Sequence, residues 1–271
     1  MKSPIDWNQA QCAWIDAQPV LDRMFLPFEL LLSRAIVASD ARRVLDVGCG
    51  TGATTLAAAR VLGAGGEAVG VDVSEPMIAV ARARAKQESL ATRFIADDAA
   101  THAFEAATFD RLISRFGVMF FEDPIAAFRN LRSAVRPGGE LDVIAWRSLE
   151  ENPFMTTAER AAASLLPTLA PRDPNAPGQF AFAHEAKVRH ILESSGWSEV
   201  VLHRIDIECV LPEAELTRYG SRMGLVGRAL ESADENTRRE VSRVVREAFQ
   251  AYVRGTEAKF IAACFRIRAK A

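Results

Sequence analysis

The stretch VLDVGCGTGA, residues 44–53, constrains the fold more than any other part of this sequence. A short apolar run leads directly into three glycines at alternate positions, Gly48, Gly50 and Gly52. An apolar run that ends in glycine predicts a buried strand. Glycines between a strand and a helix let the backbone approach a ligand, and the free N–H groups at the helix N-terminus attract a negative group. The stretch therefore predicts a ligand-binding loop at the end of a buried strand.

The same order of strand and helix patterns repeats from Arg42 to Trp146. Strands and helices that alternate at this spacing are typical of βαβ units around a parallel sheet. The pattern predicts strands at 43–48, 67–73, 92–97, 109–116 and 140–146, and helices at 53–63, 75–89 and 123–136.

The regular alternation of strand and helix patterns ends after Trp146, and helical patterns dominate from there on. They occupy 152–166, 183–197, 213–230 and 234–253, and two further strand patterns lie at 199–211 and 259–269. We therefore predict one doubly wound, Rossmann-like α/β domain, residues 1–271, with a seven-stranded sheet. Within it we expect an N-terminal helical lid carrying Trp7 and Trp14 (1–41), a cofactor-binding core (42–146), and two helical insertions on the acceptor side (147–183 and 212–255). Both insertions leave from carboxyl ends of strands, the edge at which open α/β sheets bind ligands.

The composition excludes several classes of function. The formal net charge is −2, so no overall basic field would gather nucleic acid or an anionic membrane. The arginine-rich stretch 235–247 also contains three glutamates, Glu235, Glu240 and Glu247, and this interleaving is typical of a solvated helix face. The four cysteines are scattered without C-x-x-C spacing, which argues against a structural metal site and a disulfide framework. With no apolar run long enough for a membrane span, we expect a soluble cytoplasmic protein, monomeric or homodimeric.

Asp46 narrows the choice of ligand. Gly48, Gly50 and Ala53 satisfy the G-x-G-x-x-A pattern of dinucleotide-binding folds, so NAD has to be considered. A carboxylate inside a buried strand costs several kcal/mol unless a partner compensates it, and it would repel a pyrophosphate. A ligand with a cationic centre would favour it, and S-adenosylmethionine carries a sulfonium. The alternative is that Asp46 is a structural acid that bonds its own loop.

Five stretches in order resemble the class I S-adenosylmethionine-dependent methyltransferases. VLDVGCGTG resembles their first motif, VGVDVSEPMI the second, FIADDAATHAF the third and FDRLISRFGVMFFEDP the fourth, and VRPGGELDVIAW is similar to the turn and strand that follow. The resemblance is strong over 42–146 and is greatest to the small-molecule, ubiquinone-biosynthesis-like branch. It implies a mostly parallel sheet with an antiparallel last strand.

The resemblance also implies S-adenosylmethionine as the cofactor and assigns residues to it. Asp72 would hold both ribose hydroxyls, Asp98 would accept from the adenine amino group, and the Ala99 N–H would face the adenine ring. Backbone around Ser114 and Arg115 would receive the methionine amine. The full cofactor set is Asp46, Gly48, Cys49, Gly50, Asp72, Val73, Asp98, Ala99, Ser114 and Arg115. Cys49 is either a nucleophile or a small residue that fits a tight turn, and Arg115 either orients an anionic acceptor or contributes only its backbone.

The acceptor should lie beyond the fourth and fifth strands, where apolar side chains gather. A lining of this kind suits an apolar small molecule; it comprises Phe116, Met119, Phe120, Trp146 and Phe154. A general base is needed only if the acceptor must lose a proton, and the candidates are His102 and His184.

These observations predict methyl transfer from S-adenosylmethionine to a small organic acceptor, at an oxygen, nitrogen or carbon atom. The transfer would be an in-line displacement in an enclosed, largely apolar pocket, without a metal ion and without a nucleic acid or membrane partner. Two alternatives stay open, namely an NAD-dependent oxidoreductase and a catalytically inactive module that binds S-adenosylmethionine.

Overall fold

The computed structural model describes residues 13–271 except 168 and 170–175. Its sheet follows the order β3-β2-β1-β4-β5-β8-β6. Five strands run parallel: β1 (Arg43–Val47), β2 (Glu67–Asp72), β3 (Thr92–Ala96), β4 (Phe109–Arg115) and β5 (Val135–Trp146). The last strand, β8 (Glu257–Lys270), is antiparallel to both β5 and β6 (Ser198–Pro212). The mostly parallel, Rossmann-like sheet with an antiparallel last strand is therefore confirmed, and a two-residue strand, β7 (Val253–Arg254), is added to it.

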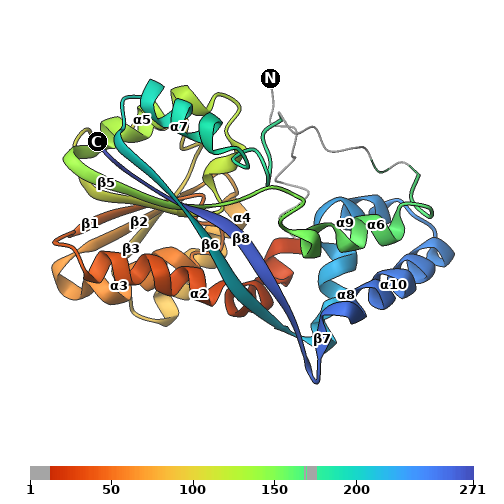
Figure 1. Ribbon diagram of the computed structural model, residues 1–271. Coiled ribbons are helices and arrows are strands. Elements are labelled where there is room, and N and C mark those ends of the chain that lie inside the picture. The colour runs from red at the N-terminus through yellow and green to blue at the C-terminus, as the bar shows by residue number, and fades with distance from the viewer. Residues whose placement is uncertain (1–12, 168, 170–175) are drawn as a thin grey trace.

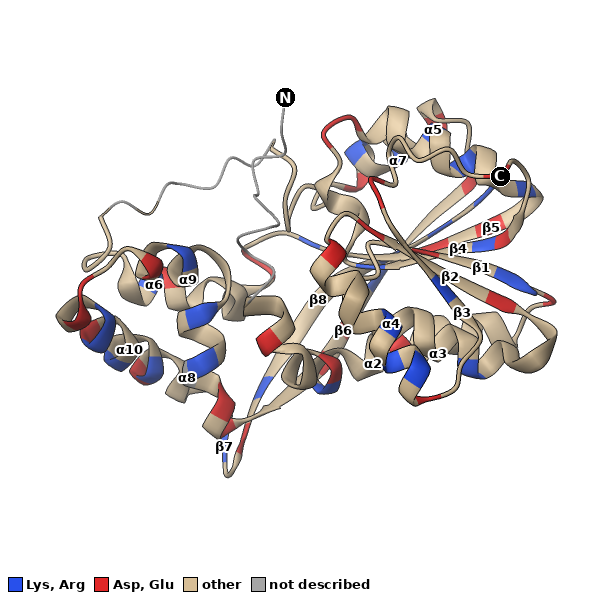
Figure 2. Ribbon diagram, turned by 180° about the vertical axis from the view of Figure 1, so that it is seen from behind, with Lys and Arg blue, Asp and Glu red and all other residues tan. Residues whose placement is uncertain are grey.

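Helices cover both faces of the sheet, as Figures 1 and 2 show. One face carries α2 (Gln18–Val37), α3 (Ala53–Leu62) and α4 (Glu75–Gln87), and the other carries α5 (Pro124–Ala134) and α7 (Glu185–Ser194). Side-chain caps fix the N-termini of α4 and α5. Ser74 accepts from the Met77 N–H at the start of α4, and Asp123 accepts from the Ala126 N–H at the start of α5. In both helices a proline occupies the first turn, where its missing N–H costs nothing.

The two insertions form a helical group beside the sheet, visible on the right of Figure 1. It contains the short turn Pro153–Thr156, α6 (Thr157–Ala162), α8 (Glu213–Arg222), α9 (Gly224–Glu231) and α10 (Glu235–Phe249). The single helix predicted at 213–230 is wrong, because Met223 is extended and Gly224 has a φ of +69°. This break turns the chain between α8 and α9.

Other boundaries also differ from the predicted ones. The helix expected at 123–136 ends at Ala134, and the following Pro-Gly-Gly already belongs to β5. The described part of the N-terminal segment, residues 13–41, contributes to the core as well as to the ligand edge of the sheet. Helix α2 packs against α3 and buries Met24, Phe28 and Leu32 completely, and only its first turns reach the ligand edge of the sheet. Trp7 lies outside the described residues.

A buried ion cluster joins the parallel and antiparallel parts of the sheet. Asp142 on β5 is fully buried, and both of its oxygens accept from Arg266 on β8, at 2.8 and 2.6 Å. Arg111 on β4 donates to the same carboxylate at 3.3 Å and also pairs with Glu140. Three adjacent strands are thus tied through one carboxylate.

We expect Asp142→Ala to lower the free energy of unfolding by about 3–5 kcal/mol, because it leaves two guanidinium groups without their buried partner. Urea denaturation of the variant and the native protein measures this difference. The control is Glu140→Gln, whose side chain is 44% exposed and should change stability by less than about 1 kcal/mol. Equal effects of the two substitutions would contradict the importance of the buried carboxylate.

Candidate functional site

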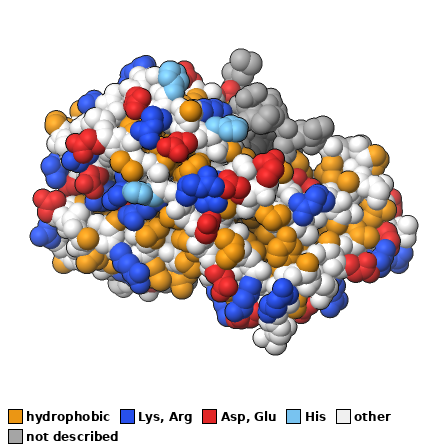
Figure 3. Space-filling view, viewed as in Figure 1, with side chains coloured by type: hydrophobic (Ala, Val, Ile, Leu, Met, Phe, Trp, Pro, Cys, Tyr) orange, Lys and Arg blue, Asp and Glu red, His pale blue; other side chains and the backbone are white. Residues whose placement is uncertain are grey.

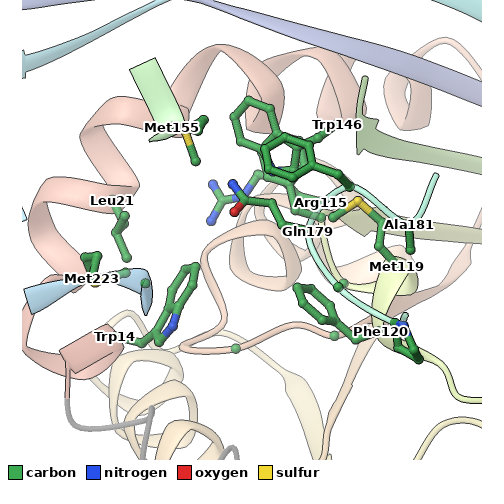
Figure 4. Close-up of a pocket in the computed structure, with 18 of the residues that line it drawn as sticks. Trp14, Leu21, Arg115, Met119, Phe120, Trp146, Met155, Gln179, Ala181 and Met223 are labelled. Atoms are coloured by element: carbon green, nitrogen blue, oxygen red, sulfur yellow. The ribbon is translucent and has the colours of Figure 1, made fainter. Parts of the chain in front are cut away.

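A cavity of about 1500 Å³ lies at the carboxyl ends of β1, β2, β4 and β5. It is lined by the glycine loop, by the first turns of α2, by the loops that follow the strands and by the helical group (Figure 4). Most sequence-predicted site residues lie on its wall. Those that do are Gly48, Cys49, Gly50, Asp72, Val73, Asp98, Ala99, Arg115, Phe116, Met119, Phe120, Trp146, Phe154 and His184.

Each glycine of the loop has its own structural reason. All three have positive φ, a region that other residues avoid. A Cβ on Gly48 would lie 2.6 Å from the Cα of Gly117, and one on Gly52 would lie 2.9 Å from the Ala81 Cβ, so packing within the protein excludes side chains there. At Gly50 the nearest atom would be the Met77 sulfur at 3.8 Å. Gly50 therefore leaves open the space that a ligand backbone contact would need.

Asp72 connects the glycine loop to the end of β2. One carboxylate oxygen accepts from the Gly50 N–H at 2.9 Å, and the other accepts from the Ser74 N–H at 2.9 Å. Burial raises the pKa of this carboxyl, and these hydrogen bonds oppose the shift. Each oxygen keeps a further lone pair for a hydroxyl donor. Asp72 can therefore shape the loop and bind a diol at the same time.

Replacing Asp72 with Ala should weaken binding of S-adenosylhomocysteine at least tenfold, since two charge-assisted hydrogen bonds to ligand hydroxyls are lost. The melting temperature without ligand should also fall, because Gly50 and Ser74 lose their acceptor. Calorimetry and thermal unfolding separate the two effects. Asp72→Asn retains one acceptor oxygen, so its ligand affinity and its melting temperature should lie between those of the native protein and Asp72→Ala. An unchanged affinity in the Ala variant would show that Asp72 only shapes the loop.

Asp46 lies below the cavity and is not part of its wall. The residue is 1% exposed; its Oδ2 accepts from the Thr55 hydroxyl at 2.6 Å, and its Oδ1 is buried without a hydrogen-bond partner in the described structure. Burial raises the pKa of Asp46 to about 7, while the Thr55 hydrogen bond and the nearby Arg115 oppose the shift. Asp46 therefore bonds a side chain of the following helix, α3. It bonds neither the glycine loop nor a group in the cavity.

This shift makes stability depend on pH. Between about pH 4 and about pH 7 the folded protein keeps a proton on Asp46 that the unfolded chain has released, so the contribution of Asp46 to stability falls as the pH rises through this window. Asp46→Asn keeps an acceptor for Thr55 and removes the titration. We expect the free energy of unfolding of the variant, relative to the native protein, to increase from pH 5 to pH 8. A difference that does not depend on pH would contradict the raised pKa.

The end of β3 presents two adjacent carboxylates with different partners. Asp97 accepts from the Asp98 N–H and pairs with the His102 Nδ1 at 2.7 Å. Asp98 accepts from the Ala100 N–H at 2.8 Å. The His102 ring is held by Asp97 and by an edge contact with Phe104, and it is not on the cavity wall. Of the two candidate bases, only His184, an exposed residue at the start of α7, borders the cavity.

The end of β4 approaches the glycine loop through backbone and hydroxyl contacts. Ser114 is fully buried; its hydroxyl donates to the Val47 carbonyl at 2.6 Å and accepts from the Gly117 N–H at 3.1 Å. Its side chain therefore joins two loops and is not on the cavity wall. Cys49 borders the cavity, but burial raises the pKa of its thiol well above the ordinary value. That shift argues against the nucleophile hypothesis, because the thiolate is the reactive form.

Aromatic rings form the wall beyond β4 and β5. Phe116 has a φ of +65° and stacks on Trp146, with ring centroids 4.3 Å apart. Phe25 from α2 contacts both rings edge-on. Phe154 of the helical group stacks on Phe260 of strand β8, with ring centroids 3.8 Å apart. These rings come from separate parts of the chain, and their packing holds the backbone of Phe116 in a conformation that costs energy.

Sequence reasoning missed a clamp between α2 and the glycine loop. Arg84 on α4 donates to the Thr51 carbonyl and to Asp22 on α2, both at 2.7 Å. Gln18 donates to the same carboxylate at 2.5 Å. Both Gln18 and Asp22 border the cavity. No motif contains these residues, and an acid on an amphipathic helix gives no signal of its partner.

Comparison with known proteins agrees with this geometry. A family model described as a methyltransferase domain matches residues 44–139. This match agrees with the class I S-adenosylmethionine-dependent methyltransferase motifs in the same segment. The methyltransferase fold extends over the chain: a structure of an S-adenosylmethionine-dependent methyltransferase from Aquifex aeolicus superposes with a TM-score of 0.53 at 15% identity, covering 98% of each chain.

Two curated relatives are also named methyltransferases. Nocamycin O-methyltransferase of Saccharothrix syringae is 31% identical over 181 residues, which is 64% of this chain and 65% of the relative. Aklanonic acid methyltransferase of Streptomyces sp. (strain C5) is 30% identical over 139 residues, 49% of this chain and 63% of the relative. The matched segment thus spans slightly less than two thirds of each relative. The assignment to the ubiquinone-biosynthesis-like branch stays a prediction.

Proposed function

We propose that this methyltransferase transfers the methyl group of S-adenosylmethionine to a small organic acceptor held in the same cavity. One observation carries the proposal: a single cavity is bordered both by the motif residues of the core and by the two helical insertions. Its volume of about 1500 Å³ exceeds the roughly 300–1,000 Å³ of a typical small-molecule site. Space therefore remains for a second molecule beside the cofactor.

The core side of the cavity fits the cofactor. Gly50 offers an open backbone face, Asp72 offers lone pairs for two hydroxyls, and Asp98 and Ala99 border the space beyond them. When bound, S-adenosylmethionine supplies a methyl group on a positively charged sulfur. The task of this chain is then alignment and exclusion of water, since holding two reactants in register can contribute roughly 7–11 kcal/mol.

The opposite side fits an apolar acceptor. Phe116 and Trp146 form one wall, and the helical insertions add Met155, Tyr219 and Met223. Figure 4 shows Met155 and Met223 across the cavity from Phe120 and Ala181. Methionine side chains adapt to irregular apolar ligands. Where the acceptor carries a proton, His184 is the base candidate that borders this space.

The surface supports a small acceptor over a nucleic acid. Figure 3 shows Lys and Arg intermingled with Asp and Glu over the visible face. On α10, Arg243 pairs with both Glu240 and Glu247, and Arg246 lies 3.8 Å from Glu213, so acids offset part of the arginine charge on this helix. The described residues include no helix that could cross a membrane and no group of side chains arranged to hold a metal ion. The acceptors in the names of the two relatives, nocamycin and aklanonic acid, agree with an organic small molecule.

The proposal predicts binding followed by transfer. Calorimetry should show micromolar binding of S-adenosylhomocysteine, and radiolabelled S-adenosylmethionine should label at least one member of a panel of mono- and polycyclic phenols, amines and carboxylic acids. Asp72→Ala serves as the control with a damaged cofactor site. Binding of NAD without S-adenosylhomocysteine would favour the oxidoreductase alternative. Cofactor binding without transfer to any acceptor would favour the inactive binding module.

A further inference from the structure

Arg115 is a cation inside the cavity without a protein partner for its charge. Its Nη1 is buried and has no hydrogen-bond partner, and among residues 13–271, apart from the undescribed gap, no carboxylate forms an ion pair with it. Its closest described interaction is with the face of the Phe25 ring, 5.6 Å from the guanidinium carbon. Arg115 is half-buried, and a buried N–H group without a hydrogen-bond partner costs stability. Burial lowers the pKa of the guanidinium, but an arginine side chain keeps its proton in proteins.

None of the three described acids nearest Arg115 accepts a hydrogen bond from it, although their charges act on it. Asp22 pairs with Arg84, and Glu29 lies 3.9 Å from Arg60. Asp46 bonds Thr55 and holds its proton up to about pH 7. The charges of these three acids raise the pKa of Arg115 without a hydrogen bond to it, and the charge of Arg84 lowers that pKa. The hydrogen-bonding capacity of the guanidinium is therefore left for a ligand.

We propose that Arg115 binds a carboxylate inside the cavity. The guanidinium presents parallel N–H groups that match the two oxygens of a carboxylate. Figure 4 shows Arg115 and Gln179 both pointing into the space between Leu21, Trp14, Met155 and Phe120. The carboxylate belongs either to the methionine part of the cofactor or to an acidic acceptor, and the inference rests on the proposed function in both cases.

The first measurement tests the cofactor as the source. S-Adenosylhomocysteine carries the carboxylate and 5′-methylthioadenosine lacks it, so the ratio of their dissociation constants isolates the carboxylate. If Arg115 binds this group, Arg115→Gln weakens S-adenosylhomocysteine at least tenfold and leaves 5′-methylthioadenosine unchanged. Unchanged binding of the second compound also shows that the adenosine site is intact, which separates this result from a failure of the proposed function.

The second measurement tests an acceptor as the source. At saturating S-adenosylhomocysteine, anthraquinone-2-carboxylate and 2-naphthoate are compared with their neutral amides. If the carboxylate is the acceptor's, the native protein prefers the acids by at least tenfold and Arg115→Gln loses the preference. In this case the ratio of the two adenosine compounds does not change.

Two further variants control for general effects. Arg115→Lys keeps the charge without the two-pronged geometry and should give a smaller loss than Arg115→Gln. Arg93→Gln removes the same charge from a side chain on β3 that is 58% exposed, and it should leave both ratios as they are. Because Arg115→Gln removes an unpaired buried charge, its melting temperature without ligand should not fall below that of the native protein. The inference is overturned if Arg115→Gln changes neither ratio.

Discussion

The site depends on how closely the loop after β1 approaches the loop after β4. A methyl group on Gly48 would lie 2.6 Å from the Gly117 Cα, and one on Gly117 would lie 2.5 Å from the Val47 carbonyl oxygen. Ser114 fixes the same approach with two hydrogen bonds. In the strand order, β1 and β4 are the neighbours at which the chain direction across the sheet reverses, the place where open α/β sheets bind ligands. The contact therefore sets the floor of the cavity.

Several charged side chains lie close to this contact between the two loops. Asp46 lies beneath it and is largely protonated below neutral pH, and Arg115 extends from the end of β4 into the cavity. Asp22 and Arg84 hold α2 against the glycine loop. Asp22 pairs with Arg84 and Asp46 keeps its proton, so the guanidinium of Arg115 is the group that we propose for a ligand carboxylate. Such a contact would let a domain with a net charge of −2 bind an acidic ligand.

The motif-bearing core was predictable because local chemistry specifies it. Short apolar runs gave the five parallel strands within one or two residues at most ends, and Ser74 directly before α4 caps that helix. The strand β5 began earlier than predicted, since its pairing with β4 extends to Val135. The insertions were less predictable. The helical periodicity of 213–230 continues through Met223, but the chain turns at Met223 and Gly224, and α8 and α9 then pack against each other.

The sequence by itself determined the fold class and the position of the ligand-binding loop, because strand periodicity and glycine spacing are local properties. The cofactor type followed from the resemblance of its motifs to a known family. Tertiary structure alone decided which side chains face the ligand. It directed Asp46 to Thr55, Ser114 to Val47 and His102 to Asp97, and it brought Asp22, Met155 and Met223 to the cavity from segments far apart in the chain. Side-chain direction depends on which elements pack together, and that information is not contained in any single motif.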